Sequence, residues 1–260
     1  STQGYSSAAS DVYKRQCLNW WYNQIGIPKT LGTVFILFEK QLTPVEKQNA
    51  ITVMENAKFG MTGQNKVWLA GNVMMRALLQ NDYELVKMAR DTIASEIVTG
   101  GAEGIKDDWC FHQHGAQQQF GNYGLSFVSG MSFFSGLFSG TSLAFDDKQL
   151  SILSTLIDKG YRWVIWKGMM DVNALGRQLF HHAPVHKALS LAFAASELGG
   201  GESDECMAVA TALLRDNYPA PAVNVLTGHK HFWQSDYTIH RRPSWMASIK
   251  MASDRIIGTE

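Results

Sequence analysis

The sequence predicts an all-α fold built from antiparallel helix hairpins. From Leu18 onward, apolar residues recur at spacings of three and four over several long windows, which is the period of amphipathic helices. No run of alternating strand-like segments separates these windows, so helix pairs are favoured over an α/β sheet. Repeated hairpins of this length indicate a toroid or a solenoid, and no repeat can be aligned that would support a consensus solenoid.

The expected helices follow one another along most of the chain. Thr43 supplies an N-cap with Pro44 at the first helical position, and Asp82 can cap the next hairpin. Glycines at 100–101 and 199–201 mark places where helices stop. The helices are expected at 29–41, 44–59, 66–79, 82–97, 122–138, 146–166, 185–198 and 203–216.

The two ends of the chain differ from this pattern. Residues 1–16 are small and polar, so we expect a non-native or disordered leader and assign 17–260 to the helical domain. The tail from about Asn224 is aromatic, rich in His and Arg, and only weakly periodic.

Composition narrows the classes of partner. Net charge is zero, with 23 basic and 23 acidic residues, so the global field favours neither nucleic acid nor a membrane surface. The three cysteines are far apart and form no CxxC pattern, so neither a disulfide framework nor a thiolate metal site is expected. No apolar run of 18 residues and no signal-peptide pattern occurs.

A polar but uncharged stretch, FHQHGAQQQFGNYG at 111–124, is the first candidate for chemistry. Its three glycines permit tight turns that would bring His114 and Tyr123 into one cavity, although a buried and satisfied histidine is the plain alternative. All eight histidines fall after Phe111, which favours a shared polar cleft suited to proton transfer near neutral pH.

Four further places each allow a functional and a plain interpretation. Adjacent Trp20 and Trp21 cannot both face one core, so one of them is expected on a groove where it can stack on a sugar. Asn65 either caps the helix beginning near residue 67 or donates its amide to a substrate. Arg177 is a site residue or a surface ion-pair residue. The basic aromatic segment 229–255 either holds an anionic chain or is a solvated face.

Five motifs in order resemble one family. NWWYNQIGIP, TGQNKVWLA, FHQHGAQQQFGNYG, DVNALGRQ and HFWQSDYTIHRRPSW are similar to the α-helical domain of polysaccharide lyase family eight, which includes chondroitin AC, hyaluronate and xanthan lyases. The resemblance runs from about Leu18 to Glu260 and implies an incomplete (α/α) toroid followed by large β domains. It also implies that the chain is truncated where those β domains would start.

The resemblance assigns roles residue by residue. It implies no cofactor and no metal, an acidic polysaccharide as the partner, a monomer, and a secreted or periplasmic location. Where chondroitin lyases have a second arginine, four residues after the first, this chain has His181. The catalytic positions are Asn65, His114, Tyr123, Arg177 and Glu260, and the substrate-binding positions are Trp20, Trp21, Gln113, His181, Trp233, His240 and Arg242.

The implied reaction is β-elimination on a polysaccharide that contains uronic acid, a carbon-oxygen lyase activity (EC 4.2.2.-). Asn65 would hydrogen-bond the carboxylate while the C5 proton leaves. A phenol ordinarily keeps its proton to about pH 10, so Tyr123 would need the cationic neighbours Arg177 and His114 to act as the base. The sequence leaves open whether Tyr123 or His114 takes the proton, and Tyr123 is favoured.

Other classes of function stay open. A glycoside hydrolase would need two flanking carboxylates, for which Asp107 and Asp108 are the candidates. A metal-dependent hydrolase could use the two His-x-His pairs at 112–114 and 229–231. A non-catalytic carbohydrate-binding fragment is the third alternative, because the chain as given is expected to be a poor enzyme with a mobile Glu260. Chondroitin-type polymers or hyaluronan are favoured over xanthan.

Overall fold

The structure is a computed structural model that describes residues 18–198 and 226–258. The chain divides into two compact units, Ser1–Ser95 and Glu96–Glu260, and each is described by itself. The predicted leader, the glycine break at 199–201 and the predicted helix at 203–216 lie outside the described residues.

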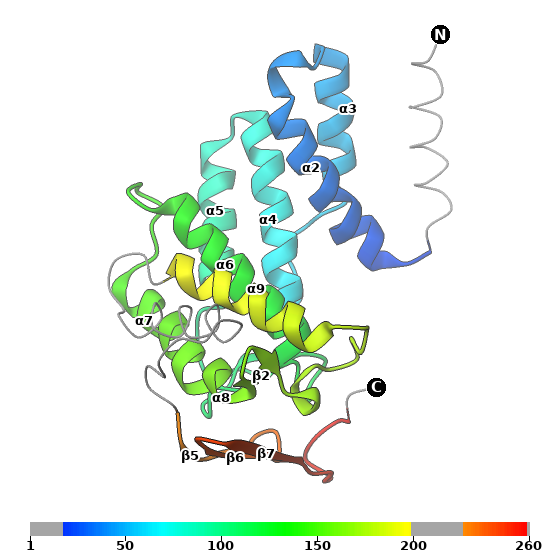
Figure 1. Cartoon of the computed structure of the whole chain (residues 1–260). Helices are drawn as coiled ribbons and strands as arrows, with labels where there is room; N and C mark the ends of the chain where they lie inside the picture. Colours follow the sequence, from blue (N-terminus) through cyan, green and yellow to red (C-terminus); the bar gives the residue numbers. More distant parts are fainter. Residues whose placement is uncertain (1–17, 199–225, 259–260) are drawn as a thin grey trace. The chain divides into compact units, whose positions relative to one another are not determined.

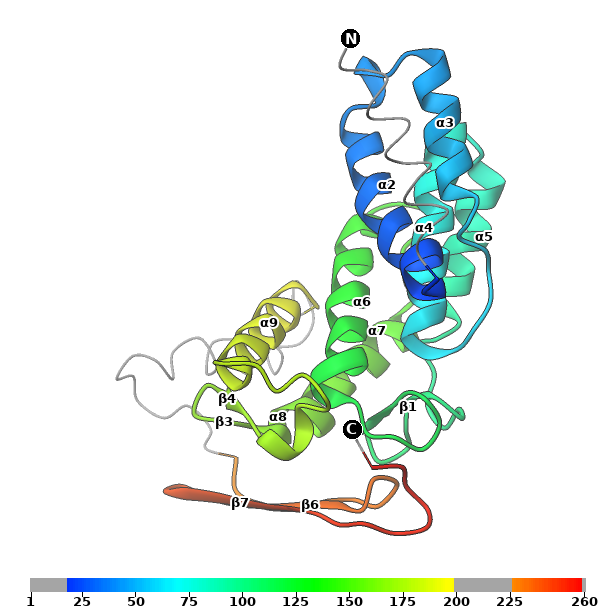
Figure 2. The same ribbon diagram turned by 90° about the vertical axis from the view of Figure 1, so that its right-hand side faces the viewer.

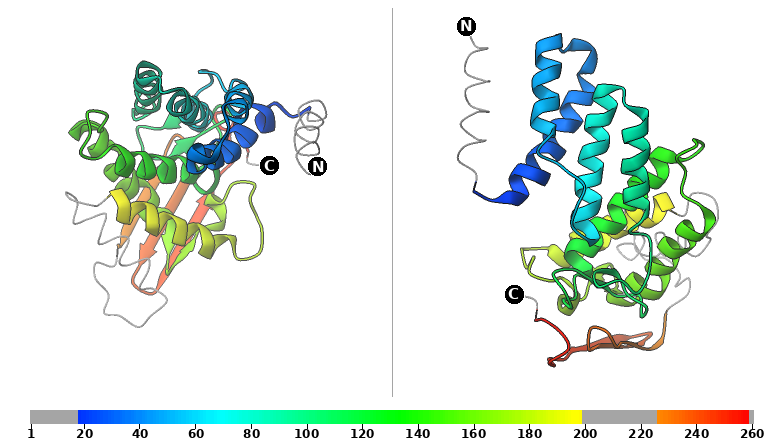
Figure 3. Two further views of the ribbon diagram at one scale, coloured as in Figure 1. Left: turned by 90° about the horizontal axis from the view of Figure 1, so that it is seen from above. Right: turned by 180° about the vertical axis from the view of Figure 1, so that it is seen from behind.

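The first unit is a set of packed helices, as predicted. The long α4 packs against α2, α3 and α5, and α2 also packs against α3 (Figures 1 and 3). The buried side chains of α4, such as Leu69, Val73 and Ala77, form the centre of this core. The elements are η1 (Tyr22–Gly26), α2 (Ile27–Leu37), η2 (Glu39–Gln41), α3 (Pro44–Met54), α4 (Gly63–Gln80) and α5 (Tyr83–Ala94).

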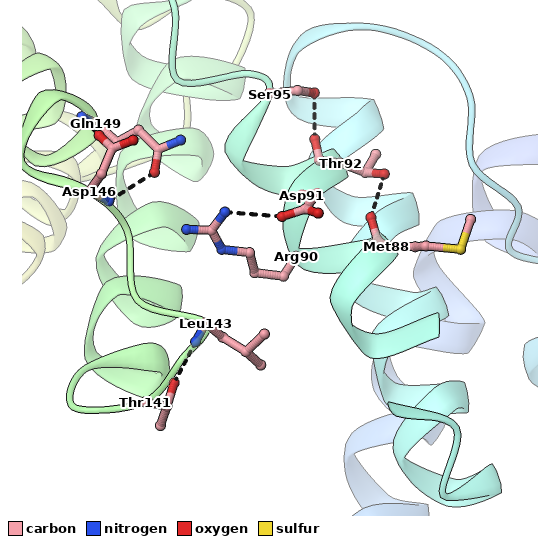
Figure 4. Close-up of polar contacts among 9 residues, drawn as sticks. All are labelled: Met88, Arg90, Asp91, Thr92, Ser95, Thr141, Leu143, Asp146 and Gln149. Atoms are coloured by element: carbon pink, nitrogen blue, oxygen red, sulfur yellow. Dashed lines mark hydrogen bonds and ion pairs between the residues drawn. The ribbon is translucent and has the colours of Figure 1, made fainter. Parts of the chain in front are cut away.

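Local sequence signals start and stop these helices. Thr43 and Glu46 form a reciprocal capping box at the start of α3, with Pro44 at the first helical position. Asp82 Oδ1 accepts from Leu85 N at 3.0 Å and so caps α5. The left-handed Asn81 ends α4. At the far end of α5, Ser95 Oγ bonds back to the carbonyl of Thr92 (Figure 4). The caps predicted at Thr43 and Asp82 are confirmed.

The second unit combines helices with short strand pairs. α6 packs against α9, and Ser132 Oγ joins them by donating to Ala194 O at 2.9 Å. A capping box between Asp146 and Gln149 begins α7 (Figure 4). The elements are β1 (Gly104–Ile105), β2 (Phe111–His112), η3 (Phe120–Gly124), α6 (Leu125–Phe138), α7 (Asp147–Thr155), η4 (Leu156–Tyr161), α8 (Arg162–Val164), β3 (Ile165–Trp166), β4 (Met169–Met170), η5 (Val172–Ala174) and α9 (Ala183–Leu198).

The chain after residue 226 corrects the prediction that the helical domain continues to Glu260. β5 (Gly228–Phe232), β6 (Tyr237–Arg242) and β7 (Trp245–Lys250) form an antiparallel three-stranded sheet. Within this unit the helices lie on one side of the sheet (Figure 2). The sequence showed little helical periodicity here because burial alternates with period two: Tyr237, Ile239 and Arg241 face inward.

Buried hydrogen bonds attach the sheet to the strand pair β1–β2. Asp108, fully buried, accepts from Cys110 N at 3.0 Å and from Gln234 N at 2.7 Å. His112 Nε2 lies 2.9 Å from Ser235 Oγ. Burial is the largest cause that lowers the pKa of His112, to about 4, and the nearby Lys106 adds to it. His112 is therefore neutral at pH 7.

This pKa predicts acid sensitivity. Between pH 6.5 and 4 the unfolded chain binds a proton at His112 that the folded chain does not, so the free energy of unfolding falls as the pH falls. We expect a loss on the order of 3 kcal/mol from this group, measured by urea unfolding at several pH values. His112→Gln should flatten the dependence of the free energy of unfolding on pH. Ser235→Ala should lower the free energy of unfolding but leave its dependence on pH unchanged. An unchanged slope in His112→Gln would contradict the assignment.

Candidate active site

Three of the predicted catalytic side chains meet in the second unit. Arg177 Nη2 donates to Tyr123 Oη at 3.3 Å, and the guanidinium carbon lies 5.9 Å from the centre of the phenol ring. The rings of His114 and Tyr123 are perpendicular, with centres 4.9 Å apart. Tyr123 is buried, whereas His114 and Arg177 are exposed. The cluster therefore places one phenol beside a permanently charged guanidinium and an imidazole, both at the protein surface.

Tyr123 is held by a π-helical turn, η3, that leads directly into α6. Gly124 lies so close to the segment that carries Tyr161 that an added Cβ would be 2.5 Å from Tyr161 Oη. The buried Tyr161 hydroxyl donates to Phe120 O at 3.0 Å, and the Phe120 and Tyr161 rings pack edge to face. The glycine and the two aromatic side chains fix the turn that presents the phenol.

Arg177 is delivered by the segment that follows β4. Asp171 caps η5, because its Oδ1 accepts from Asn173 N at 3.1 Å, and its Oδ2 accepts from Tyr237 Oη at 2.5 Å. Asn173 Nδ2 donates to Ser248 Oγ at 2.9 Å. Gly176 then turns the chain with φ of +68°. Two strands of the sheet thus anchor the segment just before Arg177.

His114 lies on a strained loop that an acidic residue holds in place. Its φ of +62° is in the left-handed region, which a non-glycine residue rarely adopts. Glu103 accepts from Gly115 N at 2.8 Å and from the Gln113 amide. Sequence reasoning missed Glu103, because nothing in the sequence indicates that it pairs across the loop.

The end of the described chain also supports this loop. Ile257 N donates to Ala116 O at 2.9 Å, and Gln117 Nε2 donates to Gly258 O at 2.7 Å. Gln119 Nε2 in turn donates to Gln117 Oε1 at 2.6 Å. Gln117 and Gln119 of the uncharged stretch are thus buried and support the loop. Glu260, the fifth predicted catalytic residue, lies outside the described residues.

In the first unit, the paired tryptophans have different surroundings. Trp20 is 40% exposed, whereas Trp21 packs edge to face on Trp68 of α4, with ring centres 5.6 Å apart. Asn65 does not cap a helix, because α4 begins at Gly63 after Thr62. Its buried Oδ1 has no hydrogen-bond partner among the described residues, so capping does not use the amide.

The other predicted binding residues occupy separate places in the second unit. Trp233 and Arg242 are exposed, and His240 stacks on Trp245 with ring centres 5.3 Å apart. The exposed His181 lies against His182, with ring centres 3.7 Å apart. The prediction of one shared cleft for all eight histidines was too broad, since His112 is buried against Ser235.

The structure weakens the glycoside hydrolase alternative. Asp108 is fully buried and binds two backbone amides, so it cannot flank a glycosidic bond. In the part of the chain that the structure describes, no group of three or more His, Cys, Asp or Glu side chains is placed to hold a metal ion. No helix in the two described ranges is long and apolar enough to cross a membrane.

Comparison with known families identifies the fold. Residues 5–197 match the N-terminal α-helical domain of polysaccharide lyase family 8, and residues 227–260 match its super-sandwich domain. The chain belongs to polysaccharide lyase family 8, and the predicted all-α toroid domain is confirmed. The second match agrees with the sheet β5–β6–β7 and corrects the expectation that the chain stops before the β domains. The first match begins inside the segment that was expected to be a non-native leader.

Named relatives support the same assignment. Chondroitinase-AC of Pedobacter heparinus is 28% identical over 91% of this chain and 35% of its own length. Xanthan lyase of Bacillus sp. is 25% identical over 98% of this chain and 31% of its own length. Hyaluronate lyase of Thermasporomyces composti is 26% identical over 91% of this chain and 35% of its own length. The chain spans about a third of the length of these relatives.

Solved structures show the same fold. A structure of chondroitinase AC lyase with bound oligosaccharide superposes with a TM-score of 0.78 at 26% identity, covering 92% of this chain and 36% of that one. The chondroitin AC lyase of Streptomyces coelicolor A3 also gives a TM-score of 0.78, at 22% identity, with 92% of this chain and 39% of that one covered.

Proposed function

We propose that this chain carries the proton-transfer site of a polysaccharide lyase that cleaves uronic-acid-containing glycosaminoglycans by β-elimination. The observation that carries the proposal is the contact of Arg177 with the Tyr123 hydroxyl, beside the His114 ring. The Arg177 guanidinium is placed to stabilise negative charge on the phenol oxygen, which is the charge that a proton-transferring phenol carries during the reaction.

The proposed reaction moves one proton between the substrate and the phenol oxygen of Tyr123, and it ends with that proton on the glycosidic oxygen O4. Tyr123 Oη, as the phenolate, takes the proton from C5 of the uronate, the electron pair of the C5–H bond forms the C4–C5 double bond, and the C4–O4 bond breaks with its electron pair on O4. The same phenol then returns the proton to O4, so no water is consumed. Arg177 stabilises the phenolate while it exists. The roles of Asn65 on the substrate carboxylate and of Glu260 stay predictions from the family resemblance.

The proposed substrate is a polymer of the chondroitin or hyaluronan type. Named relatives are a chondroitinase and a hyaluronate lyase, and a third is a xanthan lyase. In the second unit, the exposed Arg242 and Trp233 are side chains of the kind that bind an anionic sugar chain. In the first unit, the exposed Trp20 can stack on a sugar ring. A monomeric state and a secreted or periplasmic location follow from the resemblance alone.

A panel of polymers tests the substrate class. We expect chondroitin or hyaluronan, and not xanthan, to yield new ultraviolet absorbance from the unsaturated uronate, with the protein assayed at its full natural length. Tyr123→Phe serves as the blank for each polymer. Cleavage of xanthan alone would refute the substrate class, and binding of every polymer without new absorbance would favour the carbohydrate-binding alternative.

A further inference from the structure

Lys187 is a buried cation of α9 with an unusual set of partners. The residue is 5% exposed, and the ion pairs found among the described residues do not include it. Its burial lowers the pKa of the amine to about 8. A buried charge without a counter-ion costs stability, so a protein that needed only packing here would be better served by an apolar side chain.

The partners of Lys187 belong to the two segments that form the Tyr123–Arg177 contact. Lys187 Nζ donates to Gly121 O, in the turn η3 that carries Tyr123. It also donates to Gln178 Oε1 at 2.7 Å, next to Arg177 in sequence. The ring centre of Phe180, further along the same segment, lies 5.8 Å from Nζ.

The backbone of the turn that carries Tyr123 packs directly against the backbone of the segment that leads to Arg177. An added Cβ at Gly121 would lie 2.7 Å from Leu175 Cα and 2.8 Å from Ala174 O, so the two segments touch without an intervening side chain. Arg177 itself is exposed and has a long flexible side chain. The place of its guanidinium therefore depends on the backbone at 176–178, which the neighbouring Gln178 ties to Lys187.

We propose that Lys187 is a positioning residue that holds the Arg177 segment against the Tyr123 turn. It acts through Gly121 and Gln178 and does not touch the substrate. The proposal deepens the proposed lyase function and rests on it for the kinetic test alone, because the contact between Arg177 and Tyr123 can be measured without substrate.

The first test is spectroscopic. In ¹⁵N-labelled protein, the Arg177 guanidinium signal that depends on Tyr123 Oη is assigned by its loss in Tyr123→Phe. We expect Lys187→Met and Gln178→Met to lose or broaden the same signal. Gln178 is exposed, so Gln178→Met remains informative if Lys187→Met does not fold. Ser132→Ala is the matched control, because it removes a buried hydrogen bond between α6 and α9 and should keep the signal.

The second test is kinetic. We expect Lys187→Met and Gln178→Met to lower kcat about tenfold to a hundredfold with KM nearly unchanged, because small misplacements at a reacting centre are costly. Ser132→Ala should lower the unfolding midpoint and spare kcat. On an Arg177→Met background, neither substitution should lower kcat further, since their effect passes through Arg177.

The outcomes separate the two claims. A guanidinium signal that persists in both Lys187→Met and Gln178→Met, or full additivity on the Arg177→Met background, would overturn the positioning role while leaving the lyase proposal intact. Loss of the signal in a protein that eliminates no polymer would support the positioning role and refute the function.

Discussion

Tyr123→Phe should abolish elimination while the protein still binds its polymer. The substitution removes only the oxygen that, in the proposed reaction, takes up the C5 proton and protonates O4, and it leaves the ring against His114 in place. General acid–base catalysis by one group is worth up to about 10⁴-fold, so we expect kcat to fall by about 10³-fold or more. Initial rates of unsaturated uronate formation give kcat, and calorimetric titration with oligosaccharide gives binding.

Two controls make this result interpretable. Tyr83→Phe alters an exposed tyrosine of the first unit and should leave kcat unchanged. His114→Ala tests the other candidate base. If Tyr123→Phe retained most of the turnover and His114→Ala lost it, the base would be His114.

Arg177→Met should have the second largest effect. It removes the cation that donates to Tyr123 Oη at 3.3 Å, so the phenolate of the proposed reaction would lose its stabilisation. Loss of one such electrostatic donor costs about 10²-fold to 10³-fold in kcat. Steady-state kinetics on the same polymer measure this loss.

Arg177→Lys separates charge from shape. It keeps the positive charge but not the planar fork, and it should recover only part of the rate. Arg255→Met, at an exposed arginine that pairs with Asp236, is the matched control. An Arg177→Met protein with unchanged kcat would show that the contact with Tyr123 has no part in catalysis.

The helical architecture was readable from the sequence because its signals are local. The Thr43 and Asp82 caps and the period of the apolar residues depend on residues a few positions apart, and both caps appear where predicted. The sheet after residue 226 was not predicted. In its short strands buried and exposed residues alternate over only five or six positions, so the sequence there looks like an irregular tail.

The site was predictable only in part. Glycines around His114 and Tyr123 indicated turns, and the family motifs named Arg177, so the cluster itself was expected. Its supports were not, because Glu103, Asp171 and Lys187 act across long sequence separations. A lysine in an amphipathic helix is ordinarily expected at the protein surface. Only the packing of α9 in the structure shows that Lys187 is buried.

Cleavage of the polymer in ¹⁸O-labelled water distinguishes elimination from hydrolysis. In the proposed reaction, Tyr123 moves a proton from C5 to O4, and water takes no part in breaking the polysaccharide chain. Cleavage of chondroitin or hyaluronan in H₂¹⁸O should therefore yield products with new ultraviolet absorbance and no ¹⁸O at the newly formed ends by mass spectrometry. Incorporation of ¹⁸O at each cut without new absorbance would show hydrolysis and contradict the account.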